Sequence, residues 1–172
     1  MASRTLVIGL SVAALATGSA RAQEDVASRK FLEAAIARNN LEMKLGQLAE
    51  VRGSTPEVRA YGQLLARGHF PNPLAANRLA AQLHMLAPLR GSGEARAERT
   101  KLRAMADPDF DGAFVRLLAT RQAEDLTDFR GQAARGGAIA DLAREAVPIL
   151  ERQLMTVRAL ERGVSGEPAG GS

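Results

Sequence analysis

The sequence contains no cysteine and no tryptophan, and aromatic residues make up only 3% of its 172 positions. The lack of cysteine excludes disulfides, thiol nucleophiles, iron–sulfur clusters and cysteine-based zinc sites. With so few aromatic residues, the core must be built mainly from Leu, Ala, Val, Ile and Met. Such a core suits closely packed helices better than stacked sheets, and no stretch alternates cleanly between polar and apolar residues as a half-buried strand would.

Long apolar runs are absent except at the N-terminus, where the chain has the features of a secretory signal peptide. Met1–Arg4 is a short basic start, Thr5–Gly18 is mostly apolar, and an A-x-A cleavage pattern ends at Ala22. We therefore expect residues 1–22 to be cleaved, Gln23 to begin the mature chain, and the protein to be exported, most simply to a bacterial periplasm. An uncleaved N-terminal anchor is the alternative. No later segment is apolar for long enough to cross a membrane.

Strongly basic clusters are also missing, which argues against a nucleic-acid partner. The whole chain has 23 basic and 19 acidic residues, and the two signs are interleaved along it. Removal of the signal peptide takes away Arg4 and Arg21 but no acidic residue, which leaves a formal charge of +2. No basic stripe is combined with aromatic side chains that could stack on bases.

Apolar residues recur at helical spacing through most of the remaining chain. Gly53 ends the first predicted helix, and Ser54-Thr-Pro-Glu57 is a strong start for the second, because it combines capping residues, a first-turn proline and an acidic residue. Helices are expected over residues 28–52, about 54–69, 74–86, 98–106, 107–134 and 138–162.

Two prolines interrupt the second helix. Pro71 lacks an amide donor and clashes with the preceding turn, and a residue before proline is pushed away from helical angles. We expect a break or sharp kink immediately after His69, with a continuation that begins at about Leu74, just after Pro73. Pro148 is expected to kink the last helix.

Four long helices joined by short or moderate loops predict an all-α fold. The expected architecture is an antiparallel, ferritin-like four-helix bundle whose second helix is broken near Pro71 and Pro73. We expect this bundle to occupy residues 23–163. Residues 164–172 are rich in glycine and have no apolar residue to bury after Val164, so this tail is expected to be disordered.

Each of the four long helices carries one polar residue near its middle, set in an otherwise apolar stripe. These residues are Glu42, His69, Gln122 and Gln153. Mid-helix positions of an antiparallel bundle lie at a similar depth, so the four side chains are expected to converge. Because polar groups in a core must be paired, a hydrogen-bonded polar layer is the favoured interpretation.

The alternative is a metal site, since Glu42 and His69 are ligand types whereas glutamine is a poor ligand. Di-iron bundles use Glu-x-x-His pairs, and this sequence has none. Asp125 and Glu151 lie close in sequence to the two glutamines, but both are expected to face away from the apolar stripe. We therefore expect no cofactor, with an incomplete Glu42 and His69 site for a weakly bound transition metal as the alternative.

The sequence has no arrangement typical of a hydrolase. Ser28 and Ser54 are explained as helix-start residues, and neither lies in a nucleophile elbow. His84 is close to the loop that follows the second helix and is expected to be a partly exposed surface side chain. We therefore expect that the protein is not an enzyme.

Several motifs of the chain occur in an order and spacing that resemble a known family: Phe31-Leu-Glu-Ala-Ala35, Glu42–Ala49, Ser54–Tyr61, Phe110-Asp111 with Phe114, and Val147-Pro148-Ile-Leu150. The family is DUF4142, and the resemblance covers about residues 27–162. Its members are exported bacterial proteins with a ferritin-like four-helix bundle, often labelled outer membrane proteins. The resemblance therefore implies this fold and a location in the cell envelope.

The resemblance also implies a set of ligand positions, two of which are changed in this chain. The family pattern has a glutamate in the first helix, matched by Glu42, and Asp-His in the second, where Gly68 precedes His69. It has histidines in the third and last helices, where this chain has Gln122 and Gln153. The two prolines after His69 are a further departure. The resemblance thus implies a divergent member of a family whose biochemical activity is undefined.

Taken together, these features predict an exported, non-enzymatic helical-bundle protein of the bacterial envelope. Its role would be binding, structural or stress-associated, with a degenerate ferritin-like polar site and an envelope partner or small ligand that the sequence does not define. The alternative is a ferritin-like protein that binds iron or a similar metal through Glu42 and His69. A third interpretation is a small apolar ligand held where the proline break opens the bundle. Association with the outer membrane is an alternative to a soluble periplasmic protein.

Overall fold

The computed structural model of the chain describes residues 12–67, 73–85 and 93–165. All regular secondary structure in these ranges is helical, in agreement with the predicted all-α class. The described helices are α1 (Val12–Arg52), α2 (Pro56–Ala66), α3 (Pro73–Gln82), α4 (Gly93–Ala104), α5 (Asp107–Ala133) and α6 (Ala138–Ser165).

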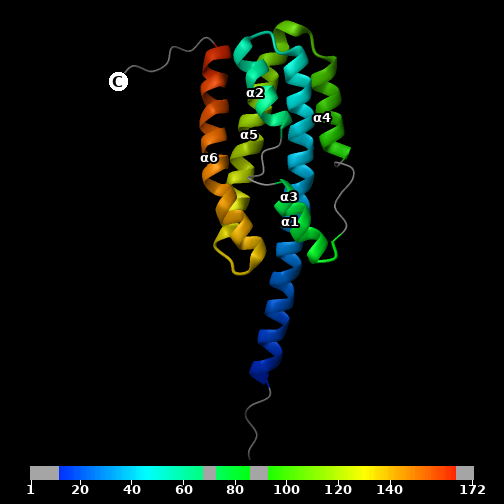
Figure 1. The fold of residues 1–172 in the computed structure, drawn as a ribbon, viewed down its shortest axis with the longest axis vertical. Coiled ribbons are helices and arrows are strands. Elements are labelled where there is room, and N and C mark those ends of the chain that lie inside the picture. Colours follow the sequence, from blue (N-terminus) through cyan, green and yellow to red (C-terminus); the bar gives the residue numbers. More distant parts are fainter. Residues whose placement is uncertain (1–11, 68–72, 86–92, 166–172) are drawn as a thin grey trace, which may run out of the picture.

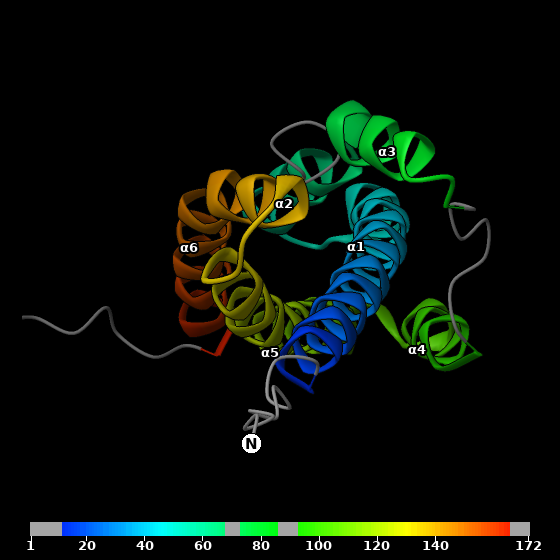
Figure 2. The same cartoon turned by 90° about the horizontal axis from the view of Figure 1, so that it is seen from below.

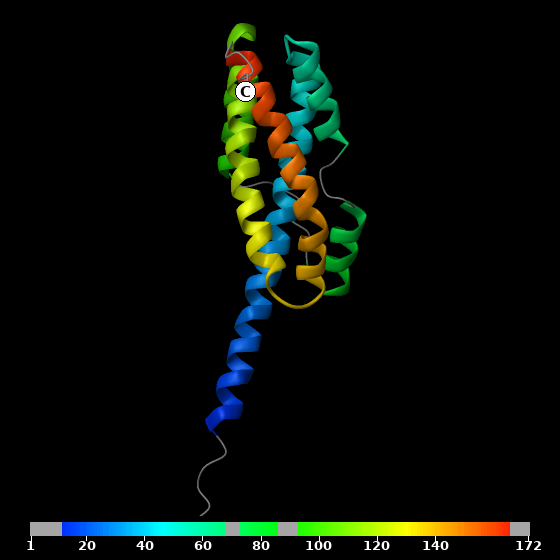
Figure 3. The ribbon, with the colours of Figure 1, turned by 90° about the vertical axis from the view of Figure 1, so that its left-hand side faces the viewer.

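Two helical hairpins make up most of the fold (Figure 1). Residues 53–55 join α1 to α2, and residues 134–137 join α5 to α6, so each pair folds back on itself through a short connection. Seen along its long axis, the molecule has α1, α2, α5 and α6 around a common centre, with α4 set to one side (Figure 2). The N-terminal end of α1, blue in the pictures, extends beyond the other helices (Figures 1 and 3).

The α1–α2 hairpin crosses very closely at two glycines. A Cβ atom built on Gly46 would lie 2.6 Å from the carbonyl oxygen of Gly62, and one built on Gly62 would lie 2.8 Å from the carbonyl oxygen of Gly46. Any larger residue at either position would therefore press into the backbone of the facing helix. This close crossing holds Tyr61, the neighbour of Gly62, against the centre of the molecule.

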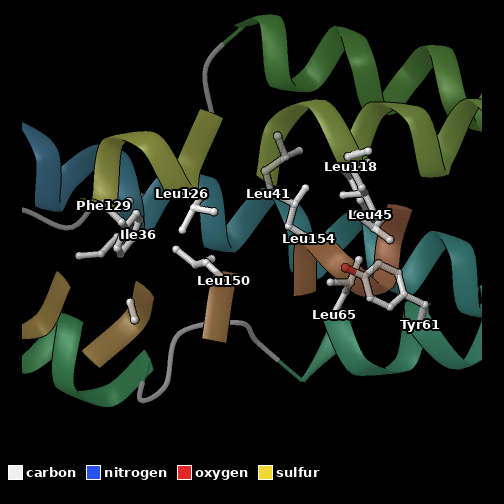
Figure 4. Packing of buried hydrophobic residues seen from close by; sticks show 14 of the residues in the cluster. Ile36, Leu41, Leu45, Tyr61, Leu65, Leu118, Leu126, Phe129, Leu150 and Leu154 are labelled. Atoms are coloured by element: carbon white, nitrogen blue, oxygen red, sulfur yellow. The ribbon is translucent and has the colours of Figure 1, made fainter. Parts of the chain in front are cut away.

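The hydrophobic core runs along the facing sides of these helices, and aliphatic side chains dominate it (Figure 4). Aromatic pairs lie towards both ends of α5: Phe110 and Phe114 stack with ring centroids 5.7 Å apart, and Phe129 meets Phe31 of α1 edge-on at 4.8 Å. The largest fully buried apolar side chains are Leu32, Leu45, Val58, Leu65, Phe110, Phe114, Val115, Leu118 and Val157.

Several helix boundaries agree closely with the sequence, and others do not. Helix α5 begins at Asp107 and α6 begins at Ala138, both as predicted. Helix α1 begins at Val12 and not at Ser28, so the prediction that Ser28 starts a helix was wrong. No proline or other strong helix breaker separates Ala22 from Ser28, and the helix therefore continues through both.

The proline-rich segment separates two helices, as predicted, but the first of them stops early. Helix α2 ends at Ala66, with Arg67 as its C-cap, and α3 begins at Pro73. His69 lies outside the described residues. Helix α3 ends at Gln82, and exposed His84 adopts a left-handed conformation with φ of 53° just beyond it.

The remaining boundaries differ by only a few residues. Helix α4 begins at Gly93, earlier than predicted, and α6 passes through Pro148 without ending. Helix α6 also extends to Ser165, so the predicted disordered tail is helical at its first two residues, and residues 166–172 lie outside the described chain. Across the described ranges, no helix combines the length and apolar character that a membrane span requires.

Candidate functional site

The predicted polar residues that the structure describes lie at the core. Glu42 on α1 is 4% exposed and Gln122 on α5 is fully buried. Gln153 on α6 is half-buried, and its amide oxygen is shielded from solvent. Because His69 lies outside the described residues, its predicted convergence with the other three stays a prediction.

Tyr61 connects the two glutamines. The hydrogen of its hydroxyl is shared between the Gln122 side-chain oxygen Oε1, at 3.0 Å, and the backbone carbonyl oxygen of Gln153, at 3.3 Å. Figure 4 shows the Tyr61 side chain beside Leu65 with its hydroxyl directed into the core. Tyr61 therefore brings α2, α5 and α6 together at one point.

The sequence analysis identified no polar role for Tyr61. The chain has one tyrosine, and a buried tyrosine hydroxyl usually requires a hydrogen-bond partner, so the residue type was a usable signal. Burial raises the pKa of Tyr61 well above its ordinary value, and the negative charge of Glu42 adds to this rise, while the hydrogen bond with Gln122 opposes it. The phenol therefore stays neutral and keeps its proton as a donor.

Asp125 is a second charged residue of this region, and the prediction that it faces away from the stripe was wrong. It is only 6% exposed, because it lies three residues after Gln122 and so shares its face of α5. Its Oδ1 atom lies 2.8 Å from Nε of Arg38, which reaches across from α1. This opposite charge reduces the cost of burying Asp125. The sequence around Asp125 does not reveal the pairing, because Arg38 belongs to another helix.

Glu151, by contrast, faces away from the core as predicted. Its side chain is partly exposed and forms a 2.6 Å ion pair with Arg130 of α5. Glu151 is therefore part of the outer surface of the α5–α6 hairpin.

The carboxyl group of Asp125 is unusually hard to ionise. Burial raises its pKa to about 7, and the nearby negative charge of Glu42 contributes to the rise. The Arg38 charge opposes this shift, but its Nε atom and Oδ1 of Asp125 lack the alignment of a hydrogen bond despite their short separation. Arg38 therefore offsets only part of the effect of burial.

Arg38 connects this buried carboxyl group to the surface. Its NH1 atom donates to Oδ2 of Asp128 at 2.7 Å, and the Asp128 side chain is 53% exposed. Arg38 and Asp128 also line a surface cavity of about 440 Å³ between α1 and α5. Glu42 follows Arg38 by four residues on α1 and so lies on the same face of the helix. We call Arg38, Glu42, Tyr61, Gln122, Asp125 and Gln153 the core polar layer.

Two amide atoms of the core polar layer have no hydrogen-bond partner among the described residues. They are Nε2 of Gln122 and Oε1 of Gln153. The Tyr61 hydroxyl can bond with only one of the two amide atoms of Gln122, so the other needs a different partner whichever way the amide is turned. Within the described chain the layer is therefore incompletely hydrogen-bonded, and each buried polar atom left without a partner costs stability.

The core polar layer fits a ferritin-type metal centre poorly. Within the described residues, no group of three His, Cys, Asp or Glu side chains is placed to hold a metal ion. Glu42 and Asp125 are the carboxylates of the layer, and Asp125 already contacts the Arg38 guanidinium. The other polar side chains are amides and a neutral phenol, which are weak ligands for such ions. We therefore derive no chemistry through a bound metal.

A second polar cluster lies at one end of the molecule and has a very different character. Asp111 of α5 is 2% exposed and accepts hydrogen bonds from both the backbone N–H and the side-chain hydroxyl of Ser54, at 3.0 and 2.6 Å. It also accepts from the backbone N–H of Thr55, at 3.1 Å. Thr55 is the N-cap of α2, through a 3.3 Å bond from the N–H of Val58. We call Ser54, Thr55 and Asp111 the loop cluster.

The hydrogen bonds of the loop cluster decide how Asp111 titrates. Burial alone would raise its pKa, but the bonds from Ser54 and Thr55 outweigh this effect and lower the pKa below its ordinary value. Ser54 therefore serves as a partner for Asp111 and not as the helix cap, while Thr55 takes the capping role that the sequence left open between the two.

Arg52 completes this end of the molecule by tying α1 to the α4–α5 junction. Its guanidinium donates to the backbone carbonyl oxygens of Leu102 at 3.0 Å and Met105 at 2.6 Å. It also pairs with Asp107 at 2.6 Å and lies over the ring of Phe110, 4.9 Å from its centroid. These contacts position the start of α5, and with it Asp111.

Described residues also line a cavity at the same end of the molecule. This cavity of about 430 Å³ lies between the start of α2 and the end of α6 and is mainly apolar; it is lined by Thr55, Glu57, Thr156, Ala159, Leu160, Gly163 and Val164. The proline break, where the sequence predicted a site for a small apolar ligand, falls outside the described residues.

Comparison with known proteins gives one finding. A family model described as Domain of unknown function (DUF4142) matches residues 13–160 of the chain. No curated protein and no solved structure matches it. The matched range covers most of the chain and includes both the core polar layer and the loop cluster. The chain therefore belongs to the DUF4142 family, as the order and spacing of its motifs indicated.

Proposed function

We propose that this protein is an exported, non-enzymatic helical-bundle protein of the bacterial envelope, with a structural or binding role. Its architecture would be that of a ferritin-like four-helix bundle in which α2 and α3 together form the second helix. In this proposal the core polar layer cross-links the helices and does not hold a resident cofactor. An unidentified envelope component or small ligand would be its partner.

The observation that carries this proposal is the way the core polar layer joins the helices. Tyr61 of α2 bonds with Gln122 of α5 and with the backbone of α6 at Gln153. Arg38 of α1 pairs with Asp125 of α5. These contacts connect side chains or backbone from four helices, as a structural core layer requires, and they engage groups that an active centre would need to present to a substrate.

Two cavities lined by described residues lie away from the centre of the core polar layer, which supports the same proposal. Neither cavity is lined by Glu42, Tyr61 or Gln122, so a molecule held in either would not touch the centre of the core polar layer. Any ligand that these cavities accept would be bound at the surface, which is consistent with a binding or structural role.

Metal analysis of the native protein tests the proposal. The mature chain would be purified from the periplasm of an expressing bacterium without chelators, and its transition-metal content measured by elemental analysis. We expect no stoichiometric metal. About one bound ion per chain, lost on changing both Glu42 and His69, would overturn the proposal.

A ferritin-like metal-binding protein is the second candidate, and one observation favours it. The carboxyl groups of Glu42 and Asp125 lie close enough in the buried layer for the charge of one to raise the pKa of the other. Oxygen ligands held together in this way attract cations. The same elemental analysis separates the two candidates, because only this one predicts a retained metal.

Export is tested separately from the role of the layer. The proposal requires a mature N-terminus at Gln23 and recovery of the protein in the periplasmic fraction. N-terminal sequencing of the purified protein, combined with cell fractionation, measures both. A chain that begins at Met1 and sediments with membranes would favour the uncleaved anchor instead.

A further inference from the structure

The Arg38 guanidinium occupies an unusual place in the structure. It spans two carboxylates of α5, with Nε 2.8 Å from Asp125 and NH1 2.7 Å from Asp128. These two aspartates are three residues apart and so lie on neighbouring turns of one helix face. A guanidinium held by both is fixed in position and stays charged at every accessible pH.

We propose that Arg38 is a built-in cation that occupies the place beside Asp125 where a metal ion would otherwise bind, and so makes the core polar layer independent of metal. This inference rests on the proposed function, since it explains why a layer with carboxylates would hold no resident ion. It also goes beyond that function, because it assigns a latent divalent-cation site to Asp125 and Glu42.

Charge is the first reason. A buried carboxylate requires a nearby positive charge, and a guanidinium and a metal ion cannot both take the same position beside one oxygen. Arg38 already contacts Oδ1 of Asp125, and its charge is repelled by any cation that approaches this atom. Arg38 therefore competes directly with metal ions for Asp125.

Access is the second reason. Arg38 lines the surface cavity between α1 and α5, whereas Asp125 is 6% exposed and does not line it. Arg38 thus separates Asp125 from the solvent in that cavity. Replacing Arg38 with a smaller, uncharged residue would open a route from this cavity to the Asp125 carboxyl group.

Ligand chemistry is the third reason. Without the guanidinium, Asp125 and Glu42 would present carboxylate oxygens to the vacated space, and water could supply further ligands. Hard divalent ions such as Mn²⁺ accept this combination of carboxylate and water oxygens. Glu42 follows Arg38 by one turn on the same face of α1 and is 4% exposed, so it is the buried carboxylate next to Arg38 along this helix.

The test uses Mn²⁺, whose electron paramagnetic resonance signal in water is lost on binding. Full-length mature protein would be compared as wild type, as Arg38→Met, as Arg38→Met with Asp125→Asn, and as Asp128→Asn. The last variant is the matched control, because it removes the exposed partner of Arg38 but leaves the guanidinium beside Asp125. Circular dichroism and thermal unfolding with and without Mn²⁺ would accompany the titrations.

We expect Arg38→Met to bind about one Mn²⁺ per chain, with an apparent Kd at least about tenfold lower than that of the wild type. Its Tm should rise when Mn²⁺ is added, and the double variant and Asp128→Asn should behave like the wild type. A folded Arg38→Met that binds no more tightly than the wild type would overturn the inference and leave the proposed function intact.

Arg38→Gln provides a second variant in case Arg38→Met does not fold alone. Folding of either variant only in the presence of Mn²⁺ would support the inference, whereas failure of both to fold with the ion present would count against it. Stoichiometric Mn²⁺ binding by the wild type would contradict the proposed function as well, because Arg38 would then not exclude the ion.

Discussion

Helix α5 carries two buried aspartates in opposite situations. Asp111 and Asp125 have nearly the same exposure, 2% and 6%. Asp111 accepts several hydrogen bonds from Ser54 and Thr55, the other members of the loop cluster, and its pKa is lowered. Asp125 is buried beside the poorly aligned Arg38 and the negative charge of Glu42, and its pKa is raised to about 7. Burial alone therefore does not determine whether the pKa of a carboxyl group rises or falls. The hydrogen-bond donors and charges around the group determine it.

The difference between the two regions follows from the backbone. At the loop cluster, the chain leaves α1 and enters α2, so free N–H groups are available at a helix start. At the core polar layer, four helices pass each other in mid-course, and their N–H groups are already bonded within the helices. A carboxyl group there depends on side chains alone, and these are harder to supply in sufficient number.

The largest expected effect comes from removing the better-satisfied aspartate. Asp111→Ala should destabilise the fold by about 3 kcal/mol, because it leaves the N–H groups of Ser54 and Thr55 without their acceptor at a buried helix start. Urea denaturation at pH 7 measures the loss. A change of less than about 1 kcal/mol would mean that water replaces the carboxylate fully and that the two regions differ less than proposed.

The pH dependence of stability should separate the two aspartates by sign. Asp125 has a raised folded-state pKa, so its contribution to stability is present below about pH 4 and is lost as the pH rises through about 7. Asp111 has a lowered pKa, so its contribution is present above pH 4 and is lost as the pH falls further.

The wild type should lose stability between pH 5 and pH 8 as Asp125 ionises, and Asp125→Asn should remove most of this loss. At pH 8 the variant should be more stable than the wild type by roughly 2 kcal/mol, and at pH 5 the two should be close. Thermal unfolding across this range measures the difference. Parallel curves for the two proteins would show that Asp125 titrates normally and that Arg38 compensates its burial in full.

Much of this arrangement could be predicted from the sequence, and the failures have a common cause. The 3.6-residue periodicity placed Glu42 and Gln122 in the core, and the helix expected from residue 107 matches the start of α5. These are local patterns that need no knowledge of the partner helix. Asp125 was assigned to the surface because its burial depends on Arg38, which belongs to another helix.

The same limit explains the two other corrections. The polar role of Tyr61 was missed because its hydroxyl partners lie on α5 and α6. Ser28 was assigned to a helix start, yet it is buried inside α1 and accepts a 2.9 Å hydrogen bond from Nε2 of Gln132. In each case a polar atom has a role that only a distant segment defines.

A smaller effect is expected at the phenol of the core polar layer. Tyr61→Phe should cost about 1 kcal/mol, because Gln122 loses its hydrogen-bond partner while the ring still fills its space. The double variant Tyr61→Phe with Gln122→Met should recover most of this loss, since both polar partners are then replaced by apolar groups. A double-mutant cycle in urea measures the coupling. Additive losses would indicate that the Tyr61–Gln122 bond contributes nothing beyond packing.

The smallest effect should come from the exposed partner of Arg38. Asp128→Asn removes a surface ion pair, for which a change of at most about 1 kcal/mol is expected. The loss should disappear in high salt, because exposed charges are screened whereas the buried pair is not. A larger or salt-independent loss would mean that Asp128 holds Arg38 in place beside Asp125. The exposed ion pair would then contribute to the stability of the core polar layer itself.

The glycine crossing between α1 and α2 determines where the Tyr61 hydroxyl can lie. If α2 slid along α1 by one turn, Val58 or Ala66 would take the place of Gly62, and its Cβ would collide with the α1 backbone near Gly46. The absence of a Cβ atom at Gly46 and at Gly62 therefore selects the register of the hairpin. The close contact at the two glycines thus fixes the position of Tyr61 along the bundle. This position does not depend on the hydrogen bond that Tyr61 makes with Gln122.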